Sequence, residues 1–487
     1  MNIGISGLAT YVPPYRVELE QWCQWTGQQW SKMREVVGHS FRMRGHQHSM
    51  YTMAATAVLR LIRQYDIDPQ RVRFLGLGTE SSLDNSAGAI IIKGMVDSAL
   101  VAEGKAPLSR ACEVPEFKHA CLGGVYAMKS ALRTLALDGR GSQAIVVCAD
   151  IAEYQRGSSG EPTQGAGAVA MLLEEDPKLA VVDLPSSGSA SDYRVMDFRK
   201  PMLRFCNQDR SETHQVQDFP VFNGKYSTTC YIDETIQALA DMYRRRDLVA
   251  ADHLASLNHI FMHRPYRRMP ENGLAVAYLW ALATGGDAHR ARLADLALGS
   301  DIDVQALVAE LTAVHDVAAL ASRERLNEET MPLTMALARL LRKHPDYESM
   351  VPSKLALGSE RMRDLGNLYT AALPAWMAAG FEEALERDLD LTGQEILTFG
   401  YGSGDAAEVI PMYIVDSWRE ATRRMRFTNA LEGPIDLTQA QYEALHDGRR
   451  VNDLPASHAD EFVIKEVGKE TDHRFQDIGI EYYRFQA

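Results

Sequence analysis

The hydrophobic pattern of the first 150 residues switches between strand-like and helix-like periods. Residues 1–12 alternate in the manner of a strand, and the segment from about 18 to 63 is mostly helical. A short apolar strand then runs into a polar turn within residues 73–84. Residues 125–135 place apolar side chains on one helical face, and 143–149 form a continuous apolar strand suited to a buried sheet. Strands and helices therefore alternate along this stretch.

A similar order of elements returns in the second half of the chain. Residues 366–380 are a polar turn that enters a helix of small residues, and 395–400 read as a strand. A Gly-x-Gly turn at 402–404 then leads into another strand. The shared order indicates an internal duplication, in which Asn367 takes roughly the place that Cys121 has in the first copy.

The segments between the two copies predict further helices and one more strand. Residues 232–246 read as an amphipathic helix that ends in arginines, which is favourable for the helix dipole. Residues 257–263 read as a strand that delivers His263 to a loop. The region 275–345 is rich in Ala and Leu and is predicted to be helical, with its charges on a solvated surface.

The end of the chain is predicted to be a packed C-terminal extension without catalytic groups. This tail, 421–487, mixes turns with a short helix near 439–445 and a strand-like segment at 481–485. We therefore expect three parts. These are a first half at 1–180, a second half at 181–420 that contains the helical insertion, and the extension.

Composition narrows the classes of function. The chain has 487 residues and a net charge of −14, which argues against non-specific binding to nucleic acid or to an anionic membrane. No apolar run approaches the roughly 20 residues needed to cross a bilayer, and the start of the chain lacks the pattern of a signal peptide. The six cysteines form no Cys-x-x-Cys pair, so neither a disulfide framework nor a structural zinc site is suggested. The expected compartment is a reducing cytoplasm.

Cys121 is the first candidate for chemistry. It lies where a loop becomes a helix, directly before Leu122 and the pair Gly123–Gly124. Unpaired amides and the dipole at a helix N-terminus favour a thiolate, so Cys121 could be a nucleophile. A buried structural cysteine is equally consistent with the local sequence.

Three other positions could serve such a nucleophile. Glu80 lies just beyond a strand end, where site residues collect in open α/β sheets, although a solvated loop carboxylate fits as well. His263 also follows a strand, and the turn at 402–404 offers backbone amides. A thiolate enzyme that forms carbon–carbon bonds needs a base and an oxyanion hole. Spacing alone leaves open whether these groups converge.

Two further signals are weak. Gly76 and Gly78 lack the third glycine of a dinucleotide-binding turn. His39, His46 and His48 lie close together, but no carboxylate or cysteine flanks them, so polar loop histidines are favoured over a metal site.

Several short motifs follow one another over about residues 1–420. They are Thr79-Glu-Ser81 with Asp84, Glu116-Phe-Lys-His-Ala-Cys121 with Gly123-Gly124, the run 164–172, Asp197-Phe-Arg-Lys-Pro201, Asn223-Gly-Lys-Tyr-Ser227, His263-Arg-Pro-Tyr266, Gly366-Asn-Leu-Tyr-Thr370 and Gly400-Tyr-Gly-Ser-Gly404. Taken together and in this order, they resemble the 3-hydroxy-3-methylglutaryl-CoA (HMG-CoA) synthase family of the thiolase superfamily.

The resemblance implies a fold and a reaction. Two α/β halves would form a thiolase-like five-layer αβαβα sandwich, usually paired as a homodimer. Cys121 would take acetyl from acetyl-CoA, and Glu80 would remove a methyl proton from acetyl-Cys121. The resulting carbanion would attack acetoacetyl-CoA, which His263 positions and polarises, and water would then release HMG-CoA, a precursor for mevalonate. Burial of Glu80 is expected to raise its pKa toward a value suited to a base.

The resemblance also assigns substrate contacts. Backbone amides near Cys121 and Ser403 would hold the thioester oxygen, and Asn367 would help to bind acetoacetyl-CoA. Tyr369 and Lys200 belong to matching motifs, and Arg268 stands where the family commonly has a lysine near the CoA phosphates. No metal or redox cofactor is called for, because the CoA thioesters are substrates.

The sequence departs from the family at Leu122, Arg199, Arg268 and Ala372, and these changes leave carrier recognition open. The acceptor could be attached to CoA or to an acyl carrier protein. A relative that acts in polyketide β-branching uses an acceptor on the carrier protein. A decarboxylating ketoacyl synthase is disfavoured by Glu80. A catalytically silent scaffold is disfavoured by the intact set of Cys121, Glu80 and His263.

Overall fold

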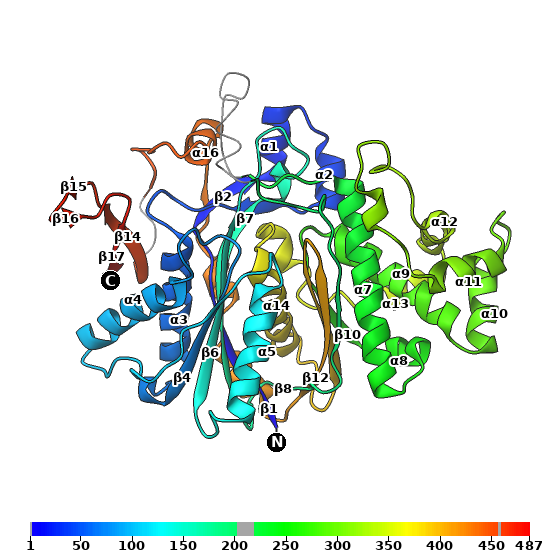
Figure 1. Cartoon of the computed structure of the whole chain (residues 1–487), viewed down its shortest axis with the longest axis horizontal. Coiled ribbons are helices and arrows are strands. Elements are labelled where there is room, and N and C mark those ends of the chain that lie inside the picture. Colours follow the sequence, from blue (N-terminus) through cyan, green and yellow to red (C-terminus); the bar gives the residue numbers. More distant parts are fainter. Residues whose placement is uncertain (1, 202–218, 456–458) are drawn as a thin grey trace.

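Two central helices lie between two sheets, and further helices cover the outer faces (Figure 1). The computed structural model describes residues 2–201, 219–455 and 459–487. The central helices are α5 (Gly123–Ala136) and α14 (Ala372–Glu386). α3 (Met50–Gln64) covers the outer face of one sheet, and α7 (Gly224–Arg246) packs on the other. This order of layers is the predicted αβαβα sandwich.

The first half builds its sheet from five strands, ordered β1-β7-β6-β4-β5. β4 is parallel to β6 and β5, whereas β7 runs antiparallel to both β1 and β6. The strands are β1 (Ile3–Tyr11), β4 (Val72–Gly78), β5 (Glu116–Phe117), β6 (Gln143–Ala152) and β7 (Gly165–Glu175). Most of their residues are buried on both faces, which explains the continuous apolar runs in the sequence.

The second half adds β10 (His259–Met262), β11 (Glu395–Gly402) and β12 (Ala406–Ile414), with β9 (Gly188–Ser191) pairing on β12. The short strand β8 (Ala180–Val182) pairs with β1 on one side and with β12 on the other. The two sheets are thereby joined into one hydrogen-bonded sheet of ten strands. The sequence pattern did not predict this link.

The predicted helical insertion is present beside α7. Its helices surround α9, which is buried along most of its length. The predicted region 275–345 holds most of α9 (Arg268–Thr284) together with α10 (Asp287–Leu296), α11 (Val304–Thr312) and α12 (Pro332–Leu341), and α13 (Pro345–Met350) follows it. α8 (Ala250–Ser256) also packs on α9 but precedes β10, outside the predicted bounds.

The remaining elements form a cap at one end and a C-terminal hairpin. The segment from 18 to 63 is helical as predicted, in α1 (Leu19–Thr26), α2 (Trp30–Val36) and α3, although β3 (Ser40–Arg42) interrupts it and pairs with β2 (Tyr15–Glu18). β13 (Ile435–Asp436) and α16 (Gln439–His446) pack onto this cap. The other elements are α4 (Gly88–Ala102), α15 (Trp418–Arg423), the hairpin of β14 (Glu461–Val467) with β17 (Glu481–Gln486), and its tip, β15 (Thr471–Asp472) with β16 (Phe475–Gln476).

Glycines let the start of α5 approach the sheet. A side chain at Gly78 would place its Cβ 2.3 Å from the Cα of Gly124, and one at Gly124 would lie 2.3 Å from the sulfur of Cys148. The glycines that follow Cys121 are therefore required by packing, and they fix its position against the end of β4. Among the described helices, none is long and apolar enough to cross a membrane.

Candidate active site

Cys121 and Glu80 meet at the N-terminal end of the central helix α5. Cys121 lies one residue before Leu122, the N-cap of α5, and Glu80 lies two residues beyond β4. The Cys121 sulfur is 3.5 Å from the Glu80 Oε2, so the thiol donates to the carboxylate. The structure thus brings together the predicted nucleophile and the predicted base.

Asp150, at the end of β6, holds the Glu80 loop in place. Its Oδ1 accepts from the backbone amides of Glu80 and Ser81 at 2.8 and 3.0 Å, and from the hydroxyl groups of Thr79 and Ser81. Its Oδ2 accepts from both the amide and the hydroxyl group of Thr370, in the second half. Asp150 therefore couples the base to the other half of the molecule. Sequence reasoning missed it, although a carboxylate at the end of a buried strand was a usable signal.

The electrostatics of Cys121 correct the prediction of a resting thiolate. Burial and the nearby carboxylates of Glu80 and Asp150 raise the pKa of the Cys121 thiol well above its usual value. This effect outweighs the helix N-terminus, because burial penalises the charged form and two acidic groups repel it. Cys121 is a neutral thiol at rest, and it needs a base to become a nucleophile.

Glu80 has the raised pKa that a buried base was expected to have. Burial, reinforced by Asp150, raises its pKa to about 8, and Lys200 and Lys118 oppose this shift. Its carboxyl group is 9% exposed. A carboxylate with a pKa near the working pH is a suitable acid and base for proton transfer.

Residues of the second half form the wall of a cavity opposite Cys121. A cavity of about 320 Å³ is lined by Cys121 together with His263, Asn367, Tyr369 and Ser403. Five of the eight predicted site residues thus line one cavity, and Glu80 reaches it through its contact with Cys121. This volume is within the usual range of small-molecule sites.

His263 lies just beyond the end of β10 and is held by its backbone. Its amide donates to the Phe399 carbonyl at 2.7 Å, and its carbonyl accepts from the Tyr231 hydroxyl at 3.1 Å. Burial alone lowers the pKa of its imidazole to about 3. His263 is therefore neutral at physiological pH and can only act as a hydrogen-bonding or polarising group.

Asn367 and Tyr369 occupy the turn before α14. The Asn367 Oδ1 accepts from the Tyr369 amide at 2.9 Å, and its Nδ2 donates to the Tyr154 hydroxyl at 3.4 Å. Tyr369 has a φ of 47°, an unfavourable conformation for a bulky residue. Its ring lies edge-on to Tyr154 and Phe198. These contacts fix the turn, and Asn367 and Tyr369 both line the cavity.

Ser403 reaches the cavity because two loops pack closely. A Cβ at Gly402 would lie 2.5 Å from the His119 carbonyl oxygen and 2.7 Å from the Leu122 Cβ. Only glycine permits this approach of the Ser403 turn to the loop that carries Cys121.

Aromatic rings close the cavity. Tyr154, Phe198, Phe222 and Tyr401 line it beside the polar groups. Phe198 and Tyr401 lie within two of the family motifs, but sequence reasoning gave none of the four a role in the site. Their apolar surface makes a site that disfavours charge.

Lys200 and Arg268 lie outside the cavity lining. Lys200 is an exposed residue, and its ammonium group donates to the Glu80 carbonyl at 3.4 Å. Arg268 begins α9 and pairs with Glu271 at 2.8 Å, directly before Met269, which does line the cavity. Lys200 thus contacts the backbone of the base, and Arg268 lies near the mouth.

The weak signals in the sequence have structural explanations. His48 is buried and lies 3.3 Å from the Glu461 carboxylate, while His39 pairs with Asp364. His39, His46 and His48 form no metal-binding group among the described residues.

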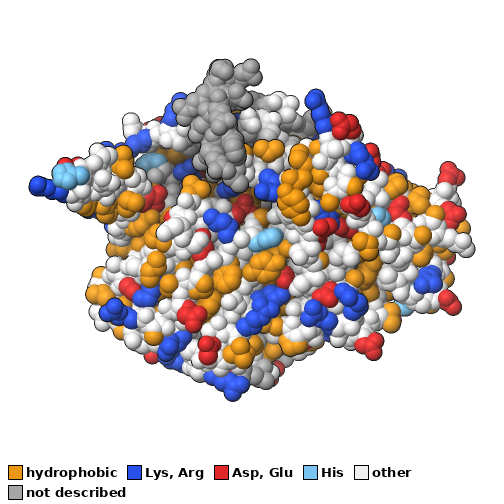
Figure 2. Space-filling view, viewed as in Figure 1, with side chains coloured by type: hydrophobic (Ala, Val, Ile, Leu, Met, Phe, Trp, Pro, Cys, Tyr) orange, Lys and Arg blue, Asp and Glu red, His pale blue; other side chains and the backbone are white. Residues whose placement is uncertain are grey.

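Cys206 lies outside the described residues. On the face shown in Figure 2, acidic and basic side chains are interspersed.

Comparison with known proteins decides the family. The model "Hydroxymethylglutaryl-coenzyme A synthase N terminal" matches residues 1–178, and the corresponding C-terminal model matches residues 344–467, together more than half of the chain. The chain belongs to the HMG-CoA synthase family. The Hydroxymethylglutaryl-CoA synthase of Haloferax volcanii is 26% identical over 438 residues, covering 88% of each chain.

Solved structures of the HMG-CoA synthase family extend over the whole chain. MvaS in complex with 3-hydroxy-3-methylglutaryl coenzyme A has a TM-score of 0.73 and 25% identity, and the match covers 100% of this chain and 99% of that one. The HMG synthase of the curacin biosynthetic pathway has a TM-score of 0.67 and 20% identity, covering 92% of this chain and 88% of that one; it has also been solved with a donor acyl carrier protein. The thiolase-like fold is therefore shown, and the protein is a condensing enzyme of this family.

Proposed function

We propose that the protein is an HMG-CoA synthase that joins acetyl-CoA to acetoacetyl-CoA through an acetyl group on Cys121. The contact of 3.5 Å between the Cys121 thiol and the Glu80 carboxylate, at the wall of the cavity, carries this proposal. A thiol beside a base can be acylated, and the same base is then placed beside the acyl group.

The proposed reaction begins with a proton transfer. Glu80 takes the Cys121 proton, the thiolate attacks the carbonyl carbon of acetyl-CoA, and CoA leaves with a proton as the free thiol. Glu80 then removes a methyl proton from acetyl-Cys121. Amides near Cys121 and Ser403 stabilise the enolate oxygen that forms.

The second substrate would approach from the wall of the second half. The neutral His263 donates a hydrogen bond to the ketone oxygen of acetoacetyl-CoA, and Asn367 helps to orient the chain. The methyl carbanion attacks the ketone carbon, the alkoxide takes up a proton, and water cleaves the thioester to Cys121. An imidazole with a pKa of about 3 is a poor general base, which supports a polarising role.

Mass spectrometry of the Cys121 peptide tests the proposal. Wild-type protein mixed with acetyl-CoA gains one acetyl group on this peptide, and Cys121→Ala abolishes both this gain and turnover. Cys112→Ala, at a partly exposed cysteine outside the cavity, is the matched control and keeps both. Absence of any acetyl group on wild-type Cys121 would instead support a silent scaffold.

Glu80→Ala separates the two chemical steps. Acetylation of Cys121 continues at a reduced rate, whereas condensation falls by more than the 10²–10⁴ typical of one acid–base group, because among the described residues Glu80 is the base hydrogen-bonded to Cys121. Turnover near the wild-type rate would remove Glu80 from the mechanism.

The alternative function uses an acceptor held on an acyl carrier protein. The comparable structural similarity to the curacin-pathway enzyme favours keeping it open. Two arginines at the mouth of the cavity favour CoA as the carrier. Arg267 pairs with Glu35 of α2 at 3.2 Å, and Arg268 lies at the start of α9, where a guanidinium group and a helix N-terminus together suit a phosphate of CoA. Steady-state rates with acetoacetyl-CoA and with an acetoacetylated carrier protein distinguish the two, and a strong preference for the carrier overturns the CoA assignment.

A homodimer is part of the proposal. Leu83 and Ile90 are 78% and 49% exposed on the loop and helix that follow β4, beside the edge strand β5. An exposed edge with apolar neighbours is a natural surface for a second copy. Leu83→Glu is expected to shift the mass measured by light scattering from dimer to monomer.

A further inference from the structure

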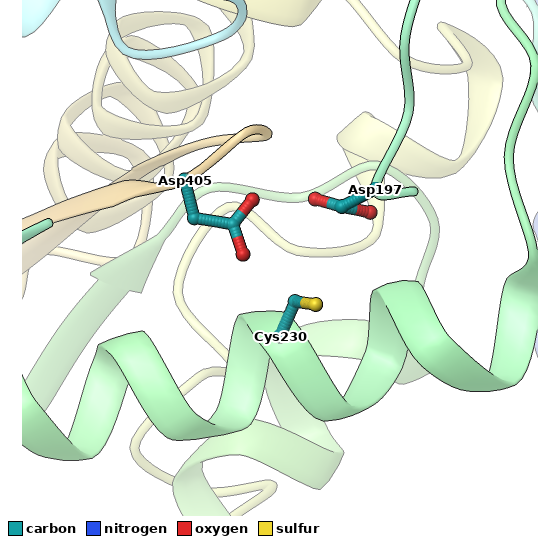
Figure 3. Close-up of side chains that lie close together, drawn as sticks. All are labelled: Asp197, Cys230 and Asp405. Atoms are coloured by element: carbon teal, nitrogen blue, oxygen red, sulfur yellow. The ribbon is translucent and has the colours of Figure 1, made fainter. Parts of the chain in front are cut away.

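Two buried carboxyl groups lie next to each other behind the Ser403 turn. Asp197, Asp405 and Cys230 point toward one another from three different segments (Figure 3), and their oxygen and sulfur atoms all lie within 4.8 Å. Asp197 and Cys230 are 0% exposed, and Asp405 is 3% exposed. The cavity does not include them, and the proposed reaction does not use them.

The hydrogen bonds of this cluster leave one oxygen of each carboxyl group unpaired. The Asp197 Oδ2 accepts from the Tyr401 hydroxyl at 2.8 Å, and the Asp405 Oδ1 accepts from the Gly404 amide. The Asp197 Oδ1 and the Asp405 Oδ2 are buried and have no donor among the described residues. Buried acceptors without a donor are costly, and a hydrogen atom on one of the two carboxyl groups would remove this cost. The Cys230 thiol is the other group of the cluster that interacts with Asp405.

A cation beside the pair, Arg194, is shared with other carboxyl groups. Its Nη2 contacts Asp192, Asp233 and Glu234 at 3.2, 2.6 and 3.2 Å, and its charge lowers the pKa of Asp405 against the larger effects that raise it. Its Nε and Nη1 are buried without a hydrogen-bond partner among the described residues, so they donate no hydrogen bond to the pair. The other titratable groups that face the pair are Cys230, Tyr226, Tyr401 and Cys121, all of which are neutral at rest. Burial, the hydrogen bond with Asp197 and the charge of Asp197 raise the pKa of Asp405 to about 9. Two carboxyl groups that share a site behave in this way.

The pair also connects the segments that build the active site. Asp405 follows Ser403 by two residues, and its backbone pairs with that of Asp192 in both directions, at 2.7 and 3.2 Å. Asp197 precedes Phe198 of the cavity wall, and it fixes Tyr401, whose ring stacks beside His263 with centroids 6.5 Å apart.

We propose that Asp197 and Asp405 share one proton, and that this proton is a positioning device for the active site. It holds the Ser403 turn against the segment that carries Phe198, and it keeps Tyr401 beside His263. When the proton is lost, the two carboxylates repel each other and the oxyanion amides and the imidazole move away from Cys121. The effect on the site rests on the proposed function, whereas the shared proton does not.

Asp405→Asn is the variant that tests the proton itself. Its amide nitrogen can donate to Asp197 at every pH, so the variant keeps the link without a titrating group. In the wild type the folded state holds one more proton than the unfolded state between the ordinary Asp pKa and about 9. The ratio of the wild-type to the variant unfolding constant therefore rises by up to about tenfold per pH unit in this range. Asp301→Asn, at an exposed residue, is the control and leaves the wild-type pH slope unchanged.

Infrared difference spectra give a second measurement that needs neither unfolding nor activity. At pH 7, wild type minus Asp405→Asn shows the carbonyl stretch of a protonated carboxylic acid. Equal pH slopes, or the absence of this band, overturn the proposal. So does one tightly held metal ion per chain that Asp405→Asn removes, because the cluster would then bind a cation in place of the proton.

The pH profile of Cys121 acetylation tests the positioning role. The wild-type rate rises as Glu80 deprotonates near pH 8 and falls again above about pH 9, whereas Asp405→Asn reaches a plateau without the fall. Asp405→Ala, which cannot donate, loses at least tenfold in rate at pH 7. Identical profiles for the wild type and Asp405→Asn would leave the pair structural and refute this role. If the wild type is not acetylated at all, the proposed function fails, and the infrared and unfolding results still decide on the proton.

Discussion

The two halves of the molecule bury their titratable groups in opposite surroundings. In the first half, Cys121 and Glu80 lie beside Asp150, and burial with mutual repulsion raises the pKa of both groups. In the second half, His263 lies among aromatic rings, and burial lowers its pKa to about 3. The thiol and the imidazole are therefore uncharged at rest, whereas the Glu80 carboxyl group, with a pKa of about 8, exchanges between its acid and carboxylate forms near the working pH. Only the carboxylate form of Glu80 can take the Cys121 proton.

Asp150 links the two halves, and its substitution is expected to have the largest effect on activity. Asp150→Ala removes the acceptor of six hydrogen bonds and frees the loop of Glu80. We expect turnover to fall by about 10³, since small misplacements of catalytic groups cost about 10² and the base itself is released. Single-turnover condensation measures this loss. Asp150→Asn keeps an acceptor toward Thr370 and should retain more activity; equal losses in both variants would point to the charge of Asp150 instead of its hydrogen bonds.

Removal of the charge from Glu80 is expected to stabilise the fold. The folded pKa of about 8 lies above the ordinary value of 4.5, so the folded state holds the proton more tightly than the unfolded state. The stability that the Glu80 proton contributes is fully present below pH 4.5 and is lost as pH rises toward 8. Glu80→Gln should gain on the order of 4 kcal/mol at pH 8 and little at pH 4.5, because a tenfold difference in proton affinity corresponds to about 1.4 kcal/mol. Urea denaturation at the two pH values checks this, and a gain that is independent of pH contradicts it.

The neutral histidine predicts a loss confined to one step. His263→Ala should lower condensation by about 10², within the range of a single polarising group. Cys121 should still be acetylated at close to the wild-type rate. Because the imidazole does not titrate in the working range, the pH profile should keep its shape. A vanished limb near neutral pH would show that His263 takes part as an acid or a base.

The smallest expected effect concerns Lys200, whose charge acts on the pKa of Glu80 in the first half. Lys200 lowers the pKa of Glu80, so Lys200→Met should raise it and move the rising limb of the acetylation profile to higher pH. Because Lys200 is exposed, the change should be less than about one pH unit and should shrink with added salt. Arg199→Met, at the exposed neighbouring residue, is the control. An opposite change would mean that Lys200 acts on another group.

Much of this fold could be predicted from the sequence, because burial leaves a clear pattern. The central helix that begins after Cys121 and the buried strand at 143–149 were both predicted, and both lie in the core. β8 was missed because three residues are too few for a periodic signal. Its role comes from long-range pairing, which no local pattern records.

The candidate site was predicted less completely. The family motifs located Cys121, Glu80 and His263, and the structure brings them to one cavity. The expectation that the helix N-terminus favours a thiolate at Cys121 was wrong. A helix terminus is visible in the sequence, but only the fold brings the carboxylate of Asp150 close to the Cys121 thiol. The shared proton of Asp197 and Asp405 could not be foreseen, since the two residues are far apart along the chain.

The short strand β8 has a consequence for how the chain folds. Since β8 is hydrogen-bonded to β1 and to β12, the two sheets can separate only if the pairs of β8 on one side are broken. We expect the two halves to unfold as one cooperative unit, because this link adds to the apolar core that they share.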